Sequence, residues 1–137
     1  MNVEALKVDL MRDEGCRMKP YRDSVGKLTI GIGRNLDDNG ITLEEAKILL
    51  ENDITSVLIE LDNKLRWWRE LPEPAQRGLA NMAFNLGLSR LLGFHKMLAA
   101  LEHGEMQIAA ASALDSKWAG QVGDRAKRIA ALFQQVE

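Results

Sequence analysis

A long helical pattern between Thr42 and Leu65 constrains the fold of this chain more than any other feature. Apolar residues recur there at spacings of three and four over more than 20 positions, as on the broad apolar face of a helix. Thr42 followed by Glu45 has the pattern of a capping box, which marks the start of the helix. Pro72 and Pro74 mark the start of the next helix. A helix of this length is expected to join two lobes.

Before this helix, the sequence predicts one short helix and a β-hairpin. Asn2 can cap the first helix, and Gly15 is a natural residue to end it. The β-branched residues within 17–33 favour a hairpin whose turn lies at 23–26. The run Asp37-Asp38-Asn39-Gly40 indicates a loop.

After the long helix, the sequence predicts only helices, which cover about residues 74–86, 90–103, 105–114 and 124–135. Asp124 is expected to cap the last of them. Because the strand signals are confined to one segment, the fold class is α+β and mainly helical, with a small β-hairpin lobe and a larger helical lobe.

The chain length of 137 residues fits one domain. We assign residues 1–137 to that domain. The small lobe covers about 14–60, and the helical lobe covers about 61–137 together with the N-terminal helix 2–13.

Composition excludes several functional classes. Cys16 is the only cysteine, so neither an internal disulfide nor a cysteine-rich zinc site can form. We expect it to be buried as a small apolar residue.

Residues 1–60 hold 8 Lys and Arg against 12 Asp and Glu, and residues 61–137 hold 10 against 8, for a net charge of -2. This balance argues against a nucleic-acid partner. No stretch approaches the roughly 20 apolar residues that span a bilayer, so stable membrane insertion is not expected.

The segment from Glu14 to Gly33 holds the residues best suited to chemistry. The negative end of the first helix dipole favours the protonated form of Glu14, which suits a general acid. Asp23, at the hairpin turn, is expected to stay ionised and to share a water with Thr29 on the return strand. Two carboxyl groups in unlike surroundings can break a glycosidic bond. Spacing alone does not decide this, because most exposed carboxylates only solvate a surface.

The resemblance of several motifs to those of a known family favours a catalytic role for Glu14 and Asp23. The first motif comprises Glu14-Gly15, Tyr21, Asp23, Gly26 and Thr29-Ile30-Gly31-Ile32-Gly33. It resembles the active-site signature of the T-even type of phage lysozymes, glycoside hydrolase family 24. Further motifs follow in the same order as in that family: Asn81–Gly87, Gly93-Phe94, Ser116-Lys117-Trp118 and 124–128.

The resemblance implies a muramidase that lyses bacterial cells. Such an enzyme hydrolyses, with inversion, the β-1,4 bond between N-acetylmuramic acid and N-acetylglucosamine in peptidoglycan. The family's catalytic residues fall on Glu14 as the acid and on Asp23 with Thr29 as the pair that activates water. Positions that match the family's cleft, and are expected to contact sugar, are Asn35, Phe84, Asn85, Ser112 and Arg125. Arg125 also matches an arginine that lies near the catalytic glutamate in family members.

One departure from the family concerns Arg34, because the family usually has a histidine there. We expect Arg34 to pair with a carboxylate on the long helix, and Asp53 is the candidate partner. The stretch between Gly33 and the long helix is also shorter than in the T-even type, so the small lobe should have fewer strands or shorter loops.

The resemblance also sets expectations about partners and location. No metal and no organic cofactor is implied. The first residues do not form a signal peptide, so we expect a protein made in the host bacterial cytoplasm that reaches the wall after release through a holin. We also expect a monomer. Two alternatives stay open: a non-catalytic glycan-binding or structural module, for instance in a phage tail, and an enzyme that acts on chitin or chitosan.

Overall fold

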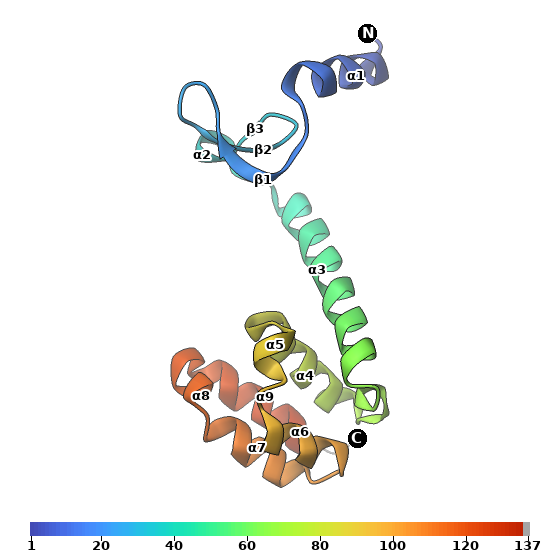
Figure 1. The fold of residues 1–137 in the computed structure, drawn as a ribbon, viewed down its shortest axis with the longest axis vertical. Helices are drawn as coiled ribbons and strands as arrows, with labels where there is room; N and C mark the ends of the chain where they lie inside the picture. Colours follow the sequence, from blue (N-terminus) through green and yellow to red (C-terminus); the bar gives the residue numbers. More distant parts are fainter. Residues whose placement is uncertain (136–137) are drawn as a thin grey trace. The chain divides into compact units, whose positions relative to one another are not determined.

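The computed structural model describes residues 1–135, and the chain divides into two compact units. The N-terminal unit is Met1–Ile48, and the C-terminal unit is Leu49–Glu137. The boundary falls within the long helix α3 (Leu43–Lys64), which is labelled in Figure 1. Together the elements form a mainly helical α+β fold with one small antiparallel sheet, which confirms the predicted fold class.

The N-terminal unit contains a helix, a three-stranded sheet and a second, short helix. These are α1 (Val3–Glu14), β1 (Arg17–Arg22), β2 (Leu28–Gly31), β3 (Arg34–Asn35) and α2 (Leu36–Asn39). The strand order is β1-β2-β3, and both pairings are antiparallel. The predicted hairpin of β1 and β2 is therefore confirmed, and β3 extends it by a second hairpin.

The loop predicted at 37–40 is wrong, because most of it forms the helix α2. Asn35 caps this helix, since its side-chain oxygen accepts a hydrogen bond of 2.9 Å from the N–H of Asp38. Acidic residues near a helix N-terminus are favourable, so the run that looked like a loop stabilises a helical turn.

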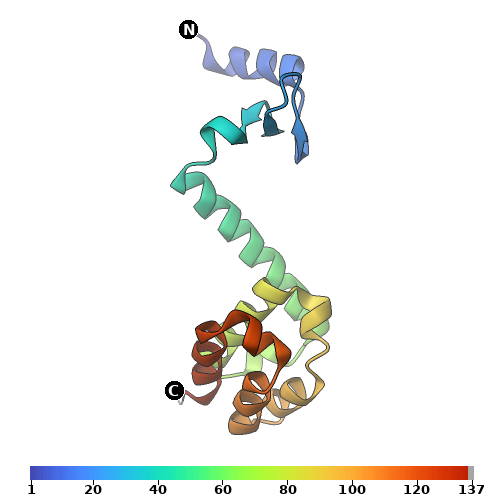
Figure 2. The ribbon, with the colours of Figure 1, turned by 90° about the vertical axis from the view of Figure 1, so that its left-hand side faces the viewer.

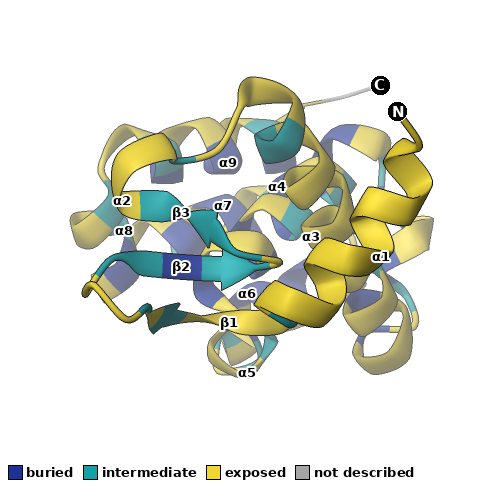
Figure 3. Cartoon of the chain, turned by 90° about the horizontal axis from the view of Figure 1, so that it is seen from above, coloured by how far each residue is buried: buried dark blue, intermediate teal, exposed yellow. Residues whose placement is uncertain are grey.

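The predicted caps of α1 are confirmed. Asn2 accepts a hydrogen bond from the Ala5 N–H, and Gly15 ends the helix with a φ of 73°. The apolar residues of α1 are exposed, and Figure 3 shows the whole helix in the colour of exposed residues.

The capping box of α3 is also confirmed. The Glu45 N–H donates to the Thr42 hydroxyl at 3.1 Å, and the Thr42 N–H donates to the Glu45 carboxylate at 2.9 Å. Along α3 the apolar face is largely exposed, and only Leu61 is fully buried. Beyond the helix, Trp68 and Leu71 are buried in the core of the C-terminal unit.

The C-terminal unit holds the hydrophobic core. After a short 3-10 helix at Trp68–Glu70 follow the helices α4 (Glu73–Leu86), α5 (Leu88–Leu91), α6 (His95–Glu102), α7 (Met106–Leu114), α8 (Lys117–Val122) and α9 (Asp124–Gln134), seen from a second side in Figure 2. Helix α9 packs against α4 and α7. Among residues 1–135, every buried apolar side chain lies between Leu61 and Phe133.

Three details of the helical prediction are wrong. The single helix expected at 90–103 is broken into α5 and α6 near Gly93, whose N–H bonds to the Arg90 carbonyl in a tight turn. Helix α8 was not predicted. Asp124 is the first residue of α9 rather than its cap, because Gly123, with a φ of 62°, occupies the cap position.

None of the helices between residues 1 and 135 combines the length and the apolar character needed to cross a membrane.

Candidate active site

Glu14 is the last residue of α1, and its side chain reaches the turn between β2 and β3. An added Cβ on Gly33 would lie 2.8 Å from Glu14 Oε2 and 3.0 Å from its Cδ. The missing side chain of Gly33 therefore leaves the space that the Glu14 carboxyl group occupies. Gly33 also has a φ of 69°, which favours glycine at this position. The end of the first helix and the second hairpin thus meet at the proposed acid.

Asp23 is held in the turn between β1 and β2 by backbone donors. Its Oδ1 accepts hydrogen bonds from the N–H groups of Val25 at 3.0 Å and Lys27 at 2.8 Å. Its own N–H donates to the Lys27 carbonyl at 2.9 Å. The carboxylate is half-buried, and these bonds fix its orientation in the turn, as in other Asp-led turns.

Thr29 is the one buried polar residue among residues 1–135, with an exposed fraction of 3%. Its hydroxyl donates to the Lys27 carbonyl at 2.8 Å, the same oxygen that accepts the Asp23 N–H. In the sheet Thr29 pairs with Tyr21 on one side and with Asn35 on the other. The backbone of Lys27 therefore bonds to both Asp23 and Thr29.

The two carboxylates of helix α2, Asp37 and Asp38, bond to the hairpin formed by β1 and β2. Asp37 accepts a hydrogen bond from the Leu28 N–H at 2.8 Å and lies 3.3 Å from an Arg22 guanidinium nitrogen. Asp38 pairs with the Lys27 ammonium at 3.0 Å. The hydrogen bond between them lowers the pKa of Asp38 and raises the pKa of Lys27. Residues on both sides of the Asp23 turn, namely Arg22, Lys27 and Leu28, therefore bond to carboxylates of α2.

Arg34 pairs with the long helix, as predicted, but the partner is Glu45 and not Asp53. Its two terminal nitrogens donate to the two carboxylate oxygens of Glu45 at 2.8 and 2.6 Å. One of them also donates to the Gly40 carbonyl at 3.1 Å. Glu45 lies in the first turn of α3, directly after the loop that this arginine contacts, whereas Asp53 lies more than two helical turns further along.

Asn35 has a local structural role in the N-terminal unit. Its oxygen caps α2, and its amide nitrogen donates to Asp38 Oδ2 at 2.9 Å. Both polar ends of the side chain are therefore engaged at the start of α2, next to its pairing with Thr29.

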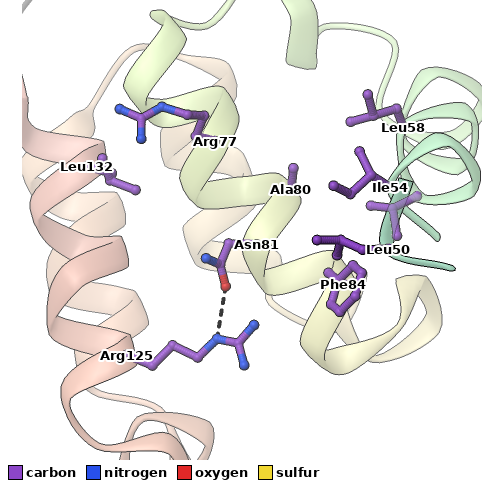
Figure 4. A pocket seen from close by; sticks show the side chains of 10 residues that line it. Leu50, Ile54, Leu58, Arg77, Ala80, Asn81, Phe84, Arg125 and Leu132 are labelled. Carbon is purple, nitrogen blue, oxygen red and sulfur yellow. Dashed lines mark hydrogen bonds between the residues drawn. The ribbon is translucent and has the colours of Figure 1, made fainter. Parts of the chain in front are cut away.

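In the C-terminal unit, Phe84 and Arg125 line one pocket of about 560 Å³. The Arg125 Nε donates to Asn81 Oδ1 at 2.9 Å, the dashed bond in Figure 4. Phe84 is 43% exposed, and most other lining residues are apolar, among them Leu50, Ile54 and Ala80. Asn81 lies in the motif Asn81–Gly87, but no pattern in the sequence singles it out as the partner of Arg125.

Asn85 and Ser112 do not line this pocket among the described residues. Asn85 Oδ1 accepts a hydrogen bond of 2.8 Å from the indole nitrogen of the buried Trp118. Ser112 lies half-buried in α7. The structure therefore brings Phe84 and Arg125 together and gives Asn85 a bond that positions α8.

Two further sequence expectations concern Cys16 and Gly33. Cys16 was expected to be buried, but it is exposed, because it lies in the connection between α1 and β1, where the N-terminal unit buries no apolar side chain. The space that Gly33 gives to Glu14 was missed, since a contact between residues so far apart depends on the turn geometry.

Comparison with known proteins places the chain in a family. The profile of the phage lysozyme family matches residues 11–135. The endolysin of Salmonella phage P22 is 34% identical over 90% of this chain and 91% of its own length. "Probable T4-type lysozyme 2" of Dictyostelium discoideum is 27% identical over 96% of this chain and 95% of its own length.

A further relative is the pre-baseplate central spike protein of Enterobacteria phage T4, which is 31% identical over 88% of this chain. The match covers 26% of that protein's length, so the chain spans about a quarter of the spike protein. The profile match over residues 11–135, together with the identity to an endolysin of similar length, shows that this chain belongs to the phage lysozyme family and is a glycoside hydrolase.

Proposed function

We propose that this lysozyme hydrolyses the β-1,4 bond between N-acetylmuramic acid and N-acetylglucosamine in peptidoglycan, with inversion, and so causes cell lysis. Membership of the phage lysozyme family supports peptidoglycan as the substrate. The observation that carries the assignment of residues is the shared anchoring of Asp23 and Thr29 on the backbone of Lys27.

In this mechanism Glu14 is the general acid. It donates its proton to the glycosidic oxygen while the bond from that oxygen to the muramic acid C1 breaks. The packing of its carboxyl group against Gly33 supports this role, because the group has a defined place beside the sheet. After the reaction Glu14 takes up a proton from solvent.

Asp23 and Thr29 would hold the attacking water on the opposite face of the sugar. The water oxygen forms the new bond to C1, and its proton passes to Asp23. Asp23 Oδ1 already accepts two N–H groups, which supports Oδ2 as the oxygen that takes the proton. The Thr29 hydroxyl donates to Lys27, so its oxygen is available as an acceptor for the same water.

For the sugar contacts we propose Asn35, Phe84, Asn85, Ser112 and Arg125. Support is strongest for Phe84 and Arg125, because they share a pocket and an exposed aromatic face suits contact with a sugar ring. The hydrogen bonds of Asn35 and Asn85 to protein groups leave each oxygen a second lone pair for a sugar hydroxyl.

We also propose that residues 1–137 work as one lysozyme domain, with a small lobe of about 14–60 and a helical lobe of about 61–137 plus helix 2–13. A single family profile over residues 11–135 supports this organisation. The endolysin among the relatives supports action on the cell wall. Synthesis in the host cytoplasm, release through a holin and a monomeric state complete the proposal.

The first experiment measures the loss of turbidity of purified peptidoglycan with the wild type and with Glu14→Gln. Loss of a general acid typically lowers the rate by about 100-fold or more. Glu4→Gln is the matched control, because it makes the same change at the other end of α1, where Glu4 only pairs with the exposed Lys7. Circular dichroism checks that all three proteins are folded.

A folded Glu14→Gln variant that clears peptidoglycan as fast as the wild type would exclude Glu14 as the acid. A folded wild type without activity would instead favour a non-catalytic glycan-binding module. A pull-down with the same purified peptidoglycan would then test binding. A parallel activity assay on chitin distinguishes an enzyme that acts on peptidoglycan from one that acts on chitin.

Inversion is tested separately by proton NMR of freshly released products. Cleavage of a β-linkage with inversion yields the α-anomer first, before mutarotation mixes the two forms. Initial appearance of the β-anomer would show retention of configuration and would overturn the proposed inverting mechanism.

A further inference from the structure

Arg34 forms a fork-shaped ion pair that joins the short strand β3 to the start of α3. Both terminal guanidinium nitrogens are used on Glu45, at 2.8 and 2.6 Å, and one also binds the Gly40 carbonyl at 3.1 Å. Paired, planar contacts of this kind are among the stronger polar interactions and also fix orientation. The two side chains are 38% and 37% exposed.

The carboxylate partner is itself fixed. Glu45 Oε1 accepts the Thr42 N–H at 2.9 Å, and the Glu45 N–H donates to the Thr42 hydroxyl, so the side chain belongs to the capping box of α3. Bonding to Arg34, with a contribution from Thr42, lowers the pKa of Glu45 to about 2. Both Glu45 and Arg34 therefore stay charged at neutral pH.

The other side of Arg34 leads to the proposed acid. Arg34 follows Gly33, against which the Glu14 carboxyl group lies. The ladder between β2 and β3 has two residue pairs, Thr29 with Asn35 and Ile30 with Arg34. Two glycines with positive φ stand where β2 ends and in the connecting turn, Gly31 at 68° and Gly33 at 69°, and glycine restrains a backbone less than any other residue. So short a ladder needs side-chain anchors to hold its turn.

We infer that Arg34 is a positioning residue for the reaction: its ion pair with Glu45 holds the Gly31–Gly33 turn, and that turn sets the position of the Glu14 carboxyl group. This inference rests on the proposed role of Glu14. Arg34 acts through the backbone of Gly33 and not by contact with the sugar.

The test separates kcat from KM for Arg34→Met on soluble peptidoglycan fragments. Misplacing a catalytic group by about 1 Å can cost about 100-fold in rate, so we expect kcat to fall roughly 10- to 100-fold. KM should change less than about twofold, since the loss concerns the transition state. Arg34→Lys keeps the positive charge but loses the forked pair of hydrogen bonds, so its kcat should lie between that of the wild type and that of Arg34→Met.

The matched control is Arg69→Met. Arg69 makes a similar forked pair with Asp62, at 2.9 and 3.2 Å, in the C-terminal unit and outside the proposed catalytic residues. Its kcat should equal that of the wild type. Because Arg34→Met can also unfold the N-terminal unit, Glu45→Gln is measured as well, and it should lower kcat in the same direction.

The outcomes are distinct. If Glu14→Gln is inactive while the Arg34 and Glu45 variants are folded and have wild-type kcat, the inference is overturned and the proposed function stands. If folded Glu14→Gln keeps wild-type activity, the proposed function fails and the inference fails with it. A lowered kcat in Arg34→Met, partly restored in Arg34→Lys and absent in Arg69→Met, supports the positioning role.

Discussion

Two glycines in one turn allow a paired test of how Glu14 is placed. Gly31 and Gly33 have nearly the same φ, 68° and 69°. An added Cβ at Gly31 would meet no atom within 4 Å, whereas at Gly33 it would lie 2.8 Å from Glu14 Oε2. The variants Gly31→Ala and Gly33→Ala therefore place alanine at nearly the same positive φ and differ in the contact with Glu14.

The magnitudes follow from this geometry. A non-glycine residue in the left-handed region costs about 1–2 kcal/mol, and the reduced entropy of the unfolded chain returns about 0.4–1 kcal/mol. Both variants should thus lose about 1 kcal/mol of unfolding free energy. At Gly33 the flexible carboxyl end must also retreat by about 0.6 Å to reach an ordinary contact of 3.4 Å. Because misplacing a catalytic group by about 1 Å can cost about 100-fold in rate, this shift of the Glu14 carboxyl group predicts a roughly tenfold lower kcat for Gly33→Ala.

Urea unfolding measures the first quantity, and initial rates on soluble peptidoglycan fragments measure the second. We expect equal destabilisation of the two variants and a lower kcat for Gly33→Ala alone. Equal rates in both variants would refute the reasoning that Gly33 places the acid. A much greater destabilisation of Gly33→Ala would show that the Glu14 side chain cannot move aside.

Two further predictions concern stability. The pKa of Glu45 lies at about 2, below its ordinary value of 4.5, so its ion pair stabilises the fold above that ordinary value, and this contribution is lost as the pH falls toward 2. Urea unfolding across that range should give a shallower pH dependence for Glu45→Gln, and an unchanged slope would contradict the pairing. Asn85→Ala removes the acceptor of the buried Trp118 indole and should cost about 1–3 kcal/mol, measured by tryptophan fluorescence during unfolding. A stability within a few tenths of the wild type would show that another acceptor takes its place.

Local signals in the sequence predicted most of the architecture. Asn2, Thr42 and Glu45 bond as their cap patterns indicate, and the β-branched residues around the turn at 23–26 predicted the first hairpin. Caps and tight turns depend on residues a few positions apart, so a single sequence contains what is needed to find them.

Contacts between distant residues were harder to predict. The partner of Arg34 depends on where the loop before α3 places Glu45, and the acidic run at 37–40 forms a helix because Asn35 caps it and β2 and Lys27 bond to its carboxylates. The break at Gly93 follows from the tight turn in which its N–H bonds to the Arg90 carbonyl. The candidate site shows the same division: the residue types of Glu14, Asp23 and Thr29 came from motifs, but the part played by Gly33 came from geometry.

The absence of a buried apolar side chain in the N-terminal unit, within residues 1–48, has a consequence for how the chain folds during synthesis. The ribosome makes this unit before any residue of the core between Leu61 and Phe133. Hydrogen bonds and exposed ion pairs contribute little by themselves in water, so the nascent unit has no apolar collapse to drive its folding. We expect its hairpins to exchange with open forms more readily than the helices around the core do. The carboxyl groups of the proposed mechanism, Glu14 and Asp23, would then lie in the less stably folded of the two units.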